Sequence, residues 1–189
     1  NFLKFFNFLS TKESSIVCET YLPFFLEKLL QIKLDGVPQE WNFNYSITKQ
    51  FDLSKRKQIT LLNNQKLDEK NKDLESFIRK ILPNCIPISL FEEYEEILKL
   101  IKNYPKRPKM IISATKFHSN DLFKFYSANK LEEGTRIISG QHGNGSFLLP
   151  ESKYSPDYRF TEYYYTWGNK TKKNFIPLFN VNIVNKRKI

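Results

Sequence analysis

The fold of this chain is decided by residues 109–140, which read KMIISATKFHSNDLFKFYSANKLEEGTRIISG. Residues 109–114 and 136–139 are short apolar runs with the length of buried strands. Between them, Ser119-Asn120-Asp121 can cap a helix, and Gly134 is placed to end it. A strand, a helix and a strand within about 30 residues predict a parallel pair joined by a right-handed crossover. We therefore predict an α/β protein with a Rossmann-like parallel sheet.

Upstream of this unit the pattern is mainly helical. We expect amphipathic helices over residues 1–10, 20–34, 64–80 and 89–103. Residues 39–56 lack a clear period and are predicted to be a loop with at most a short strand. Ser89 and Glu92 have the spacing of a capping box at the start of the last of these helices. We assign residues 1–104 to a mainly helical amino-terminal region and residues 105–189 to the βαβ half.

Composition allows a substantial core and weighs against a nucleic-acid partner. The chain has 189 residues, of which 40% are hydrophobic, so it can fold as one domain or slightly more. Its net charge of +10 comes from 24 lysines and only six arginines, spread along the whole sequence. Nucleic-acid readers usually cluster arginine among aromatic residues. We therefore expect no nucleic-acid partner, and the opposite reading would require a clustered positive face and strongly salt-dependent binding.

The cysteines and the amino-terminal segment indicate the compartment. Cys18 and Cys85 form neither a CxxC pair nor a zinc spacing, which is typical of a reduced cytoplasmic protein. The apolar segment over residues 1–9 is too short to span a bilayer, although its aromatic residues and lysine suit peripheral attachment to the inner face of a membrane. The chain begins with Asn1, so we expect a fragment of a longer protein.

The candidate site centres on the glycine-rich segment after the second strand. Gly140, Gly143 and Gly145 surround His142, one of only two histidines. Glycine permits positive φ and close approach to a ligand, and histidine suits proton transfer near neutral pH. The backbone N–H groups of Gly143, Asn144 and Gly145 could form a nest for an anion. The alternative is an ordinary turn with an exposed histidine, because the segment matches neither common nucleotide-binding fingerprint.

The loop over residues 115–120 should lie near His142, because adjacent parallel strands end at the same edge of a sheet. Thr115 and Lys116 are therefore candidate substrate-binding residues, and Lys116 could help to hold a phosphate. We expect His118 to be exposed or structural rather than catalytic.

Two further residues are candidates on position alone. Glu19 lies just before the helix over residues 20–34, where its carboxylate either interacts with the helix dipole or serves as a second acid/base group. Trp167 ends a third strand predicted over residues 163–168, and its ring either stacks on a sugar or base or lies in the core. We expect no metal site, because two histidines have no carboxylate at ligand spacing, and no cofactor.

Several short segments, in the same order along nearly the whole chain, carry a family resemblance. Gly140-Gln141-His142-Gly143 matches a GQHGG-type motif, and Trp167-Gly168 matches most of a WGW motif. The other matches are Glu19-Thr20-Tyr21-Leu22-Pro23, Val37-Pro38-Gln39-Glu40-Trp41, Ala114-Thr115-Lys116-Phe117 and Phe123-Lys124-Phe125-Tyr126-Ser127-Ala128. Together they resemble a family of transferases found among surface-carbohydrate (lipopolysaccharide or capsule) biosynthesis proteins.

The chain departs from this family at the candidate site. Asn144-Gly145-Ser146-Phe147 stands where the family tends to have GGxYG, and Asn169 replaces the second tryptophan of WGW. Glu162 stands where the family usually has an aspartate. These differences leave a divergent or inactive member as an alternative.

The family is similar to two-domain glycosyltransferases of the GT-B kind, of which this chain would hold the amino-terminal half. The resemblance implies transfer from a nucleotide-sugar donor to a polysaccharide or lipid-linked acceptor. It implies His142 as the base and Glu19 as the supporting acid. Gln141, Gly143 and Asn144 would then donate hydrogen bonds to the anionic donor group. The alternative is a truncated, non-catalytic module that binds an acceptor or a partner.

Overall fold

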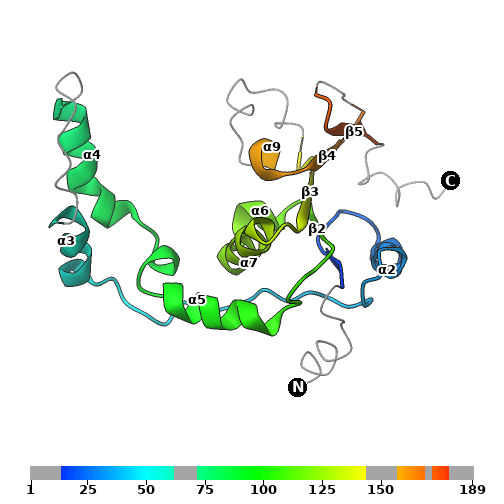
Figure 1. The fold of residues 1–189 in the computed structure, drawn as a ribbon, viewed down its shortest axis with the longest axis horizontal. Coiled ribbons are helices and arrows are strands. Elements are labelled where there is room, and N and C mark those ends of the chain that lie inside the picture. The colour runs from blue at the N-terminus through cyan, green and yellow to red at the C-terminus, as the bar shows by residue number, and fades with distance from the viewer. Residues whose placement is uncertain (1–13, 62–71, 144–156, 169–171, 179–189) are drawn as a thin grey trace. The chain divides into compact units, whose positions relative to one another are not determined.

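The computed structural model describes residues 14–61, 72–143, 157–168 and 172–178 (Figure 1). The chain divides into two compact units. Residues 1–44 and 100–189 form one, which we call the sheet unit, and Tyr45–Lys99 form the other, which we call the helical unit. The helix predicted over residues 1–10 lies outside the described residues.

The sheet unit contains five parallel strands in the order β1-β2-β3-β4-β5 (Figure 1). They are β1 (Ile16–Val17), β2 (Met110–Ser113), β3 (Arg136–Gly140), β4 (Tyr163–Thr166) and β5 (Phe175–Pro177). In register, Ile111 of β2 pairs with Ile16 on one side and Ile137 on the other, and all three side chains are buried. The predicted α/β fold with a Rossmann-like parallel sheet is confirmed.

Strands β1 and β5 were not predicted from the sequence. β1 has only two residues, Ile16 and Val17, which is too short for a periodic pattern to show. The strand exists because Ile16 and Val17, both fully buried, continue the sheet beyond β2. A strand from within the predicted amino-terminal helical region therefore pairs with the sheet of the 105–189 half.

Within the described residues, the helices of the sheet unit are α2 (Phe24–Lys33), η2 (Ile101–Asn103), α6 (Lys116–Ser119), α7 (Asp121–Glu132) and α9 (Asp157–Phe160). The predicted helix after the first strand is confirmed in α7. Asn120 caps it, since Asn120 Oδ1 accepts the N–H of Phe123 at 2.8 Å. Gly134 follows its end with φ of +90°, a conformation that favours glycine.

Aromatic side chains build the core beside α7. Phe43 is fully buried and stacks on Tyr104 with ring centroids 4.3 Å apart. It also meets the edge of Phe123 at 4.9 Å, and Asn120 Nδ2 donates to the Phe43 carbonyl at 3.1 Å. The segment predicted as a loop around residues 39–44 therefore contributes to the core, although it forms no regular element.

The helical unit contains α3 (Leu53–Leu61), α4 (Lys72–Cys85), η1 (Ile88–Leu90) and the start of α5 (Tyr94–Leu100). The predicted helix over residues 89–103 is split, and α5 begins only at Tyr94. Glu92 does not cap a continuous helix there; its carboxylate pairs with Arg56, whose side chain is fully buried. The Arg56 guanidinium lowers the pKa of Glu92 to about 2 and also donates to the Pro83 carbonyl at 2.8 Å.

Gly140 is required for packing and not for a positive φ. The glycines around His142 suggested a positive φ, but neither Gly140 nor Gly143 has one. Instead, a Cβ on Gly140 would lie 1.9 Å from Cζ of Tyr165. The buried Tyr165 ring therefore occupies the space above Gly140, and its hydroxyl donates to the Thr20 carbonyl at 3.3 Å.

Replacing Gly140 by alanine is expected to destabilise the protein, because the Tyr165 ring must move. Overpacking of this kind costs about 1–3 kcal/mol, which corresponds to a fall in Tm of roughly 2–12 °C for a chain of this size. Thermal unfolding followed by circular dichroism measures it. Gly143→Ala is the matched control, because its Cβ would meet no described atom within 4 Å. Equal Tm values for the two variants would contradict this packing role.

Candidate site at the carboxyl edge of the sheet

The carboxyl ends of β1, β2 and β3 bring the predicted residues to one edge of the sheet. Glu19 follows β1, Thr115 and Lys116 follow β2, and His142 follows β3. The parallel pairing of these strands makes this arrangement necessary. The prediction that the 115–120 loop lies near His142 is confirmed, because the rings of His118 and His142 have centroids 5.0 Å apart.

Glu19, Thr115 and Lys116 form one cluster at this edge. Lys116 Nζ lies 2.7 Å from Glu19 Oε1, and the Thr115 hydroxyl donates to Glu19 Oε2. Ser113 Oγ accepts the N–H of Lys116 at 3.1 Å, which fixes the start of α6. Partial burial opposes ionisation of Glu19, but hydrogen bonds from Lys116 and Thr115 lower its pKa below the ordinary value. Glu19 is therefore a carboxylate near neutral pH, which does not favour its expected role as an acid.

The backbone that carries Glu19 is strained. Glu19 and Tyr21 have φ of +48° and +66°, in the left-handed region that side chains other than glycine rarely adopt. Such residues cost about 1–3 kcal/mol each and persist where surrounding contacts fix them. Here the Glu19 carbonyl accepts the N–H of Ala114 at 3.1 Å, and Glu27 Oε2 accepts the hydroxyl of Thr20 at 2.8 Å. Strain of this kind is typical of functional sites.

His142 is exposed and is held by Tyr21. The Tyr21 hydroxyl contacts His142 Nδ1 and donates to the His142 carbonyl oxygen at 3.1 Å. A hydroxyl has one proton and a carbonyl only accepts, so both contacts are hydrogen bonds only when Nδ1 carries a proton. In the neutral ring Nε2 is then the basic nitrogen. The contacts with Tyr21 therefore place the basic lone pair of the neutral His142 ring on Nε2.

Three side chains near His142 were not selected as site residues from the sequence: His118, Asp157 and Tyr21. His118, expected to be exposed or structural, has Nε2 2.8 Å from Asp157 Oδ2. Asp157, in α9, is buried; burial raises its pKa, and the nearby His118 and His142 oppose that rise. No spacing links residues 118 and 157, so only tertiary contact could identify them. Tyr21 lies within the quoted Glu19–Pro23 segment, which was the available signal for it.

Gln141 braces the loop that presents His142. Its buried side chain accepts the N–H of Trp167 through Oε1 at 2.8 Å and donates through Nε2 to the Gly143 carbonyl at 3.0 Å. Its own N–H donates to the Tyr165 carbonyl at 2.9 Å. Trp167 is half-buried beside it. The predicted site residues Asn144 and Gly145 lie outside the described residues, so the nest remains a prediction.

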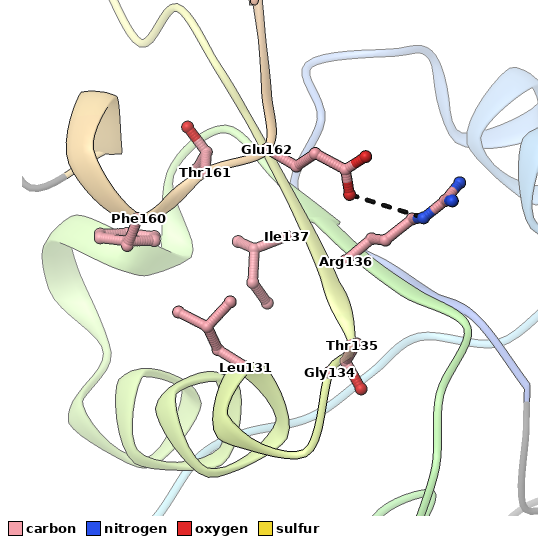
Figure 2. A pocket seen from close by; sticks show the side chains of 8 residues that line it. All are labelled: Leu131, Gly134, Thr135, Arg136, Ile137, Phe160, Thr161 and Glu162. Carbon is pink, nitrogen blue, oxygen red and sulfur yellow. Dashed lines mark ion pairs between the residues drawn. The ribbon is translucent and has the colours of Figure 1, made fainter.

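The opposite edge of the sheet carries a separate pocket. It lies at the amino-terminal ends of β3 and β4 and has a volume of about 340 Å³. Figure 2 shows the side chains of Leu131, Ile137 and Phe160 turned toward one another, with the ion pair between Arg136 and Glu162 beside them. None of the predicted site residues lines it.

Among the described residues, no group of three or more histidines, cysteines, aspartates and glutamates could hold a metal ion. Over the same residues, no helix has the length and apolarity needed to cross a bilayer.

Substituting Lys116 by methionine is expected to raise the carboxyl pKa of Glu19 toward 4.5, its ordinary value. NMR titration of the side-chain carboxylate measures the change. Lys124→Met, which removes the exposed pair with Asp121, is the control and should leave Glu19 unchanged. Because the folded pKa is lowered, the Glu19 contacts stabilise the fold above the unfolded pKa, and this contribution is lost as pH falls through the folded value. An unshifted Glu19 titration in Lys116→Met would show that Lys116 is not the cause of the lowered pKa.

Comparison with known proteins gives one result. The model of a family described as LIC12162 family transferase matches residues 1–189. No curated protein and no solved structure matches the chain.

Proposed function

The chain belongs to the LIC12162 family of transferases, and we propose that it transfers a glycosyl or glycosyl-phosphate group from a nucleotide-sugar to a hydroxyl of a surface-polysaccharide or lipid-linked acceptor. One observation carries the proposal. An exposed histidine, whose Nδ1 is held by Tyr21, stands at the carboxyl edge of a parallel sheet. Ligands of such sheets bind outside this edge.

In this mechanism His142 Nε2 removes the proton of the acceptor hydroxyl. For glycosyl transfer, the acceptor oxygen then bonds to the anomeric carbon of the sugar while the bond from that carbon to the donor phosphate oxygen breaks. The proton remains on His142, and the nucleotide leaves with its phosphate groups. The Tyr21 hydroxyl accepts from Nδ1–H throughout, which favours the imidazolium that forms.

The charges at this edge suit an anionic donor. Lys116 brings a cation to the edge of the sheet that also carries the base, and the whole chain has a net charge of +10. Lys116 is also paired with Glu19, so a bound phosphate would share this lysine with the carboxylate. Donors aimed at developing phosphate charge are commonly the largest contribution to such catalysis.

His142→Gln is expected to lower kcat/KM for nucleotide-sugar turnover by about 10²–10⁴-fold, because it removes the general base. Release of nucleotide is measured against a panel of nucleotide-sugars, with binding of each followed by isothermal titration calorimetry. Lys106→Ala, at an exposed position, is the control and should turn over at the unaltered rate. Binding without turnover by the unaltered protein would favour a non-catalytic module, and turnover by His142→Gln at the normal rate would exclude His142 as the base.

Tyr21→Phe is expected to lower kcat by about tenfold, the equivalent of one hydrogen bond of about 1.4 kcal/mol. The ring remains, so its packing beside His142, with centroids 5.9 Å apart, is retained. Steady-state kinetics at fixed pH measure the effect. The matched control is Tyr163→Phe in β4, whose side chain is exposed. Equal kcat values for the two variants would argue against the Tyr21 hydroxyl as the group that sets the tautomer.

A further inference from the structure

His118 is tied to a buried carboxylate at the same edge as His142. His118 Nε2 lies 2.8 Å from Asp157 Oδ2, and the side chains of His118 and Asp157 are 40% and 5% exposed. A buried carboxylate is costly unless it is paired. Asp157 therefore both requires a donor and fixes the orientation of the His118 ring, whose other nitrogen, Nδ1, has no hydrogen bond to the described part of the chain.

The two histidines have different partners although their rings lie together. Their centroids are 5.0 Å apart and their planes differ by 30°. His142 contacts the neutral hydroxyl of Tyr21, whereas His118 contacts the carboxylate of Asp157. Two titratable groups whose surroundings differ in charge are suited to opposite roles in proton transfer. The hydroxyl partner suits His142 to accept a proton, and the carboxylate partner suits His118 to donate one.

We propose that His118, carried as an imidazolium on Asp157, is a second catalytic residue that donates its Nδ1 proton to the leaving phosphate oxygen of the donor. This inference rests on the proposed function and names the general acid of that same site. Asp157 is the positioning residue. Glu19 does not take this role, because its hydrogen bonds with Lys116 and Thr115 lower its pKa and favour the carboxylate, which has no proton to donate.

The proton balance explains why the two rings lie side by side. As His142 Nε2 takes the proton of the acceptor hydroxyl, His118 Nδ1 gives one to the phosphate oxygen released from the sugar. The acceptor oxygen forms its bond to carbon, and the bond from carbon to the phosphate oxygen breaks. During the transfer, the pair of imidazoles therefore keeps a single positive charge. Proton exchange with water restores the starting state.

The pH profile of kcat/KM with the active nucleotide-sugar tests the assignment. The unaltered protein should give a bell-shaped profile, with the acidic limb from His142 and the alkaline limb from His118. The charged and titratable groups around His118 are Asp157 of α9, His142 after β3, Lys116 of its own helix, and Tyr21 beside His142. His118→Gln should remove the alkaline limb and lower kcat by about 10²–10⁴-fold with a smaller change in KM, whereas His142→Gln should remove the acidic limb. Retention of the alkaline limb in His118→Gln would overturn the inference.

Asp157→Asn tests positioning, with thermal unfolding recorded alongside. This variant keeps an acceptor for His118 but removes the charge, so kcat should fall about tenfold or more with KM nearly unchanged. Asp121→Asn at the start of α7 is the control, because the Asp121 carboxylate is partly exposed and pairs with a surface lysine, Lys124. If Asp157→Asn lowers Tm but leaves kcat unchanged, Asp157 is structural and the inference fails.

Binding of inorganic pyrophosphate separates the two proposals. NMR of the two histidine rings should show perturbed His118 signals, and His118→Gln should weaken binding about tenfold or more. If the unaltered protein turns over no nucleotide-sugar but binds pyrophosphate through His118, the proposed function fails and the phosphate contact stands. If turnover is normal in His118→Gln, the proposed function stands and the acid assignment fails. If pyrophosphate binds equally to the unaltered protein and to His118→Gln, the phosphate contact of His118 is refuted.

Discussion

The packing of the Tyr165 ring over Gly140 is the constraint on which the candidate site depends. No side chain can replace the hydrogen of Gly140 without displacing this ring. The ring thereby reaches from β4 across the end of β3, and its hydroxyl meets the carbonyl of Thr20 after β1. Gln141 completes the connection, because its side chain bonds the N–H of Trp167. Three strand ends are thus joined by buried contacts, and His142 lies exposed on a loop whose base is fixed.

The segment after β1 at this edge has a strained backbone and is held by hydrogen bonds of Thr20. Glu19 and Tyr21 adopt left-handed backbone conformations, which would relax if the chain around them were free. The bonds of Thr20 to Glu27 and to Tyr165 hold that short segment in place. Because Tyr21 is positioned by this segment, the orientation of the His142 ring depends on strain stored after β1. Buried contacts of Thr20 therefore help to fix the position of the exposed His142 ring.

Glu19 and Asp157, the two carboxylates described at this edge, each pair with a basic side chain. Glu19 is satisfied by Lys116 and Thr115, and Asp157 by His118. The His142 ring lies between Tyr21 and His118, and its contact with Tyr21 is to a neutral hydroxyl. The two neighbouring rings therefore differ in their partners, because one contacts a hydroxyl and the other a carboxylate.

The sequence by itself determined the βαβ unit, the cap at Asn120, the glycine after α7 and the parallel edge that carries Thr115, Lys116 and His142, because local propensity and strand length encode these features. It did not reveal β1 or the pairing of Arg56 with Glu92. It suggested a positive φ at Gly140, whereas the structure shows that Gly140 makes room for the Tyr165 ring. The tertiary structure decided these points because each depends on residues far apart in the chain: a two-residue strand is defined by its neighbour, and Gly140 by the ring of Tyr165 from the next strand. The contact between His118 and Asp157 is of the same kind. The fold brings these two side chains together, and no pattern of spacing along the chain predicts their contact.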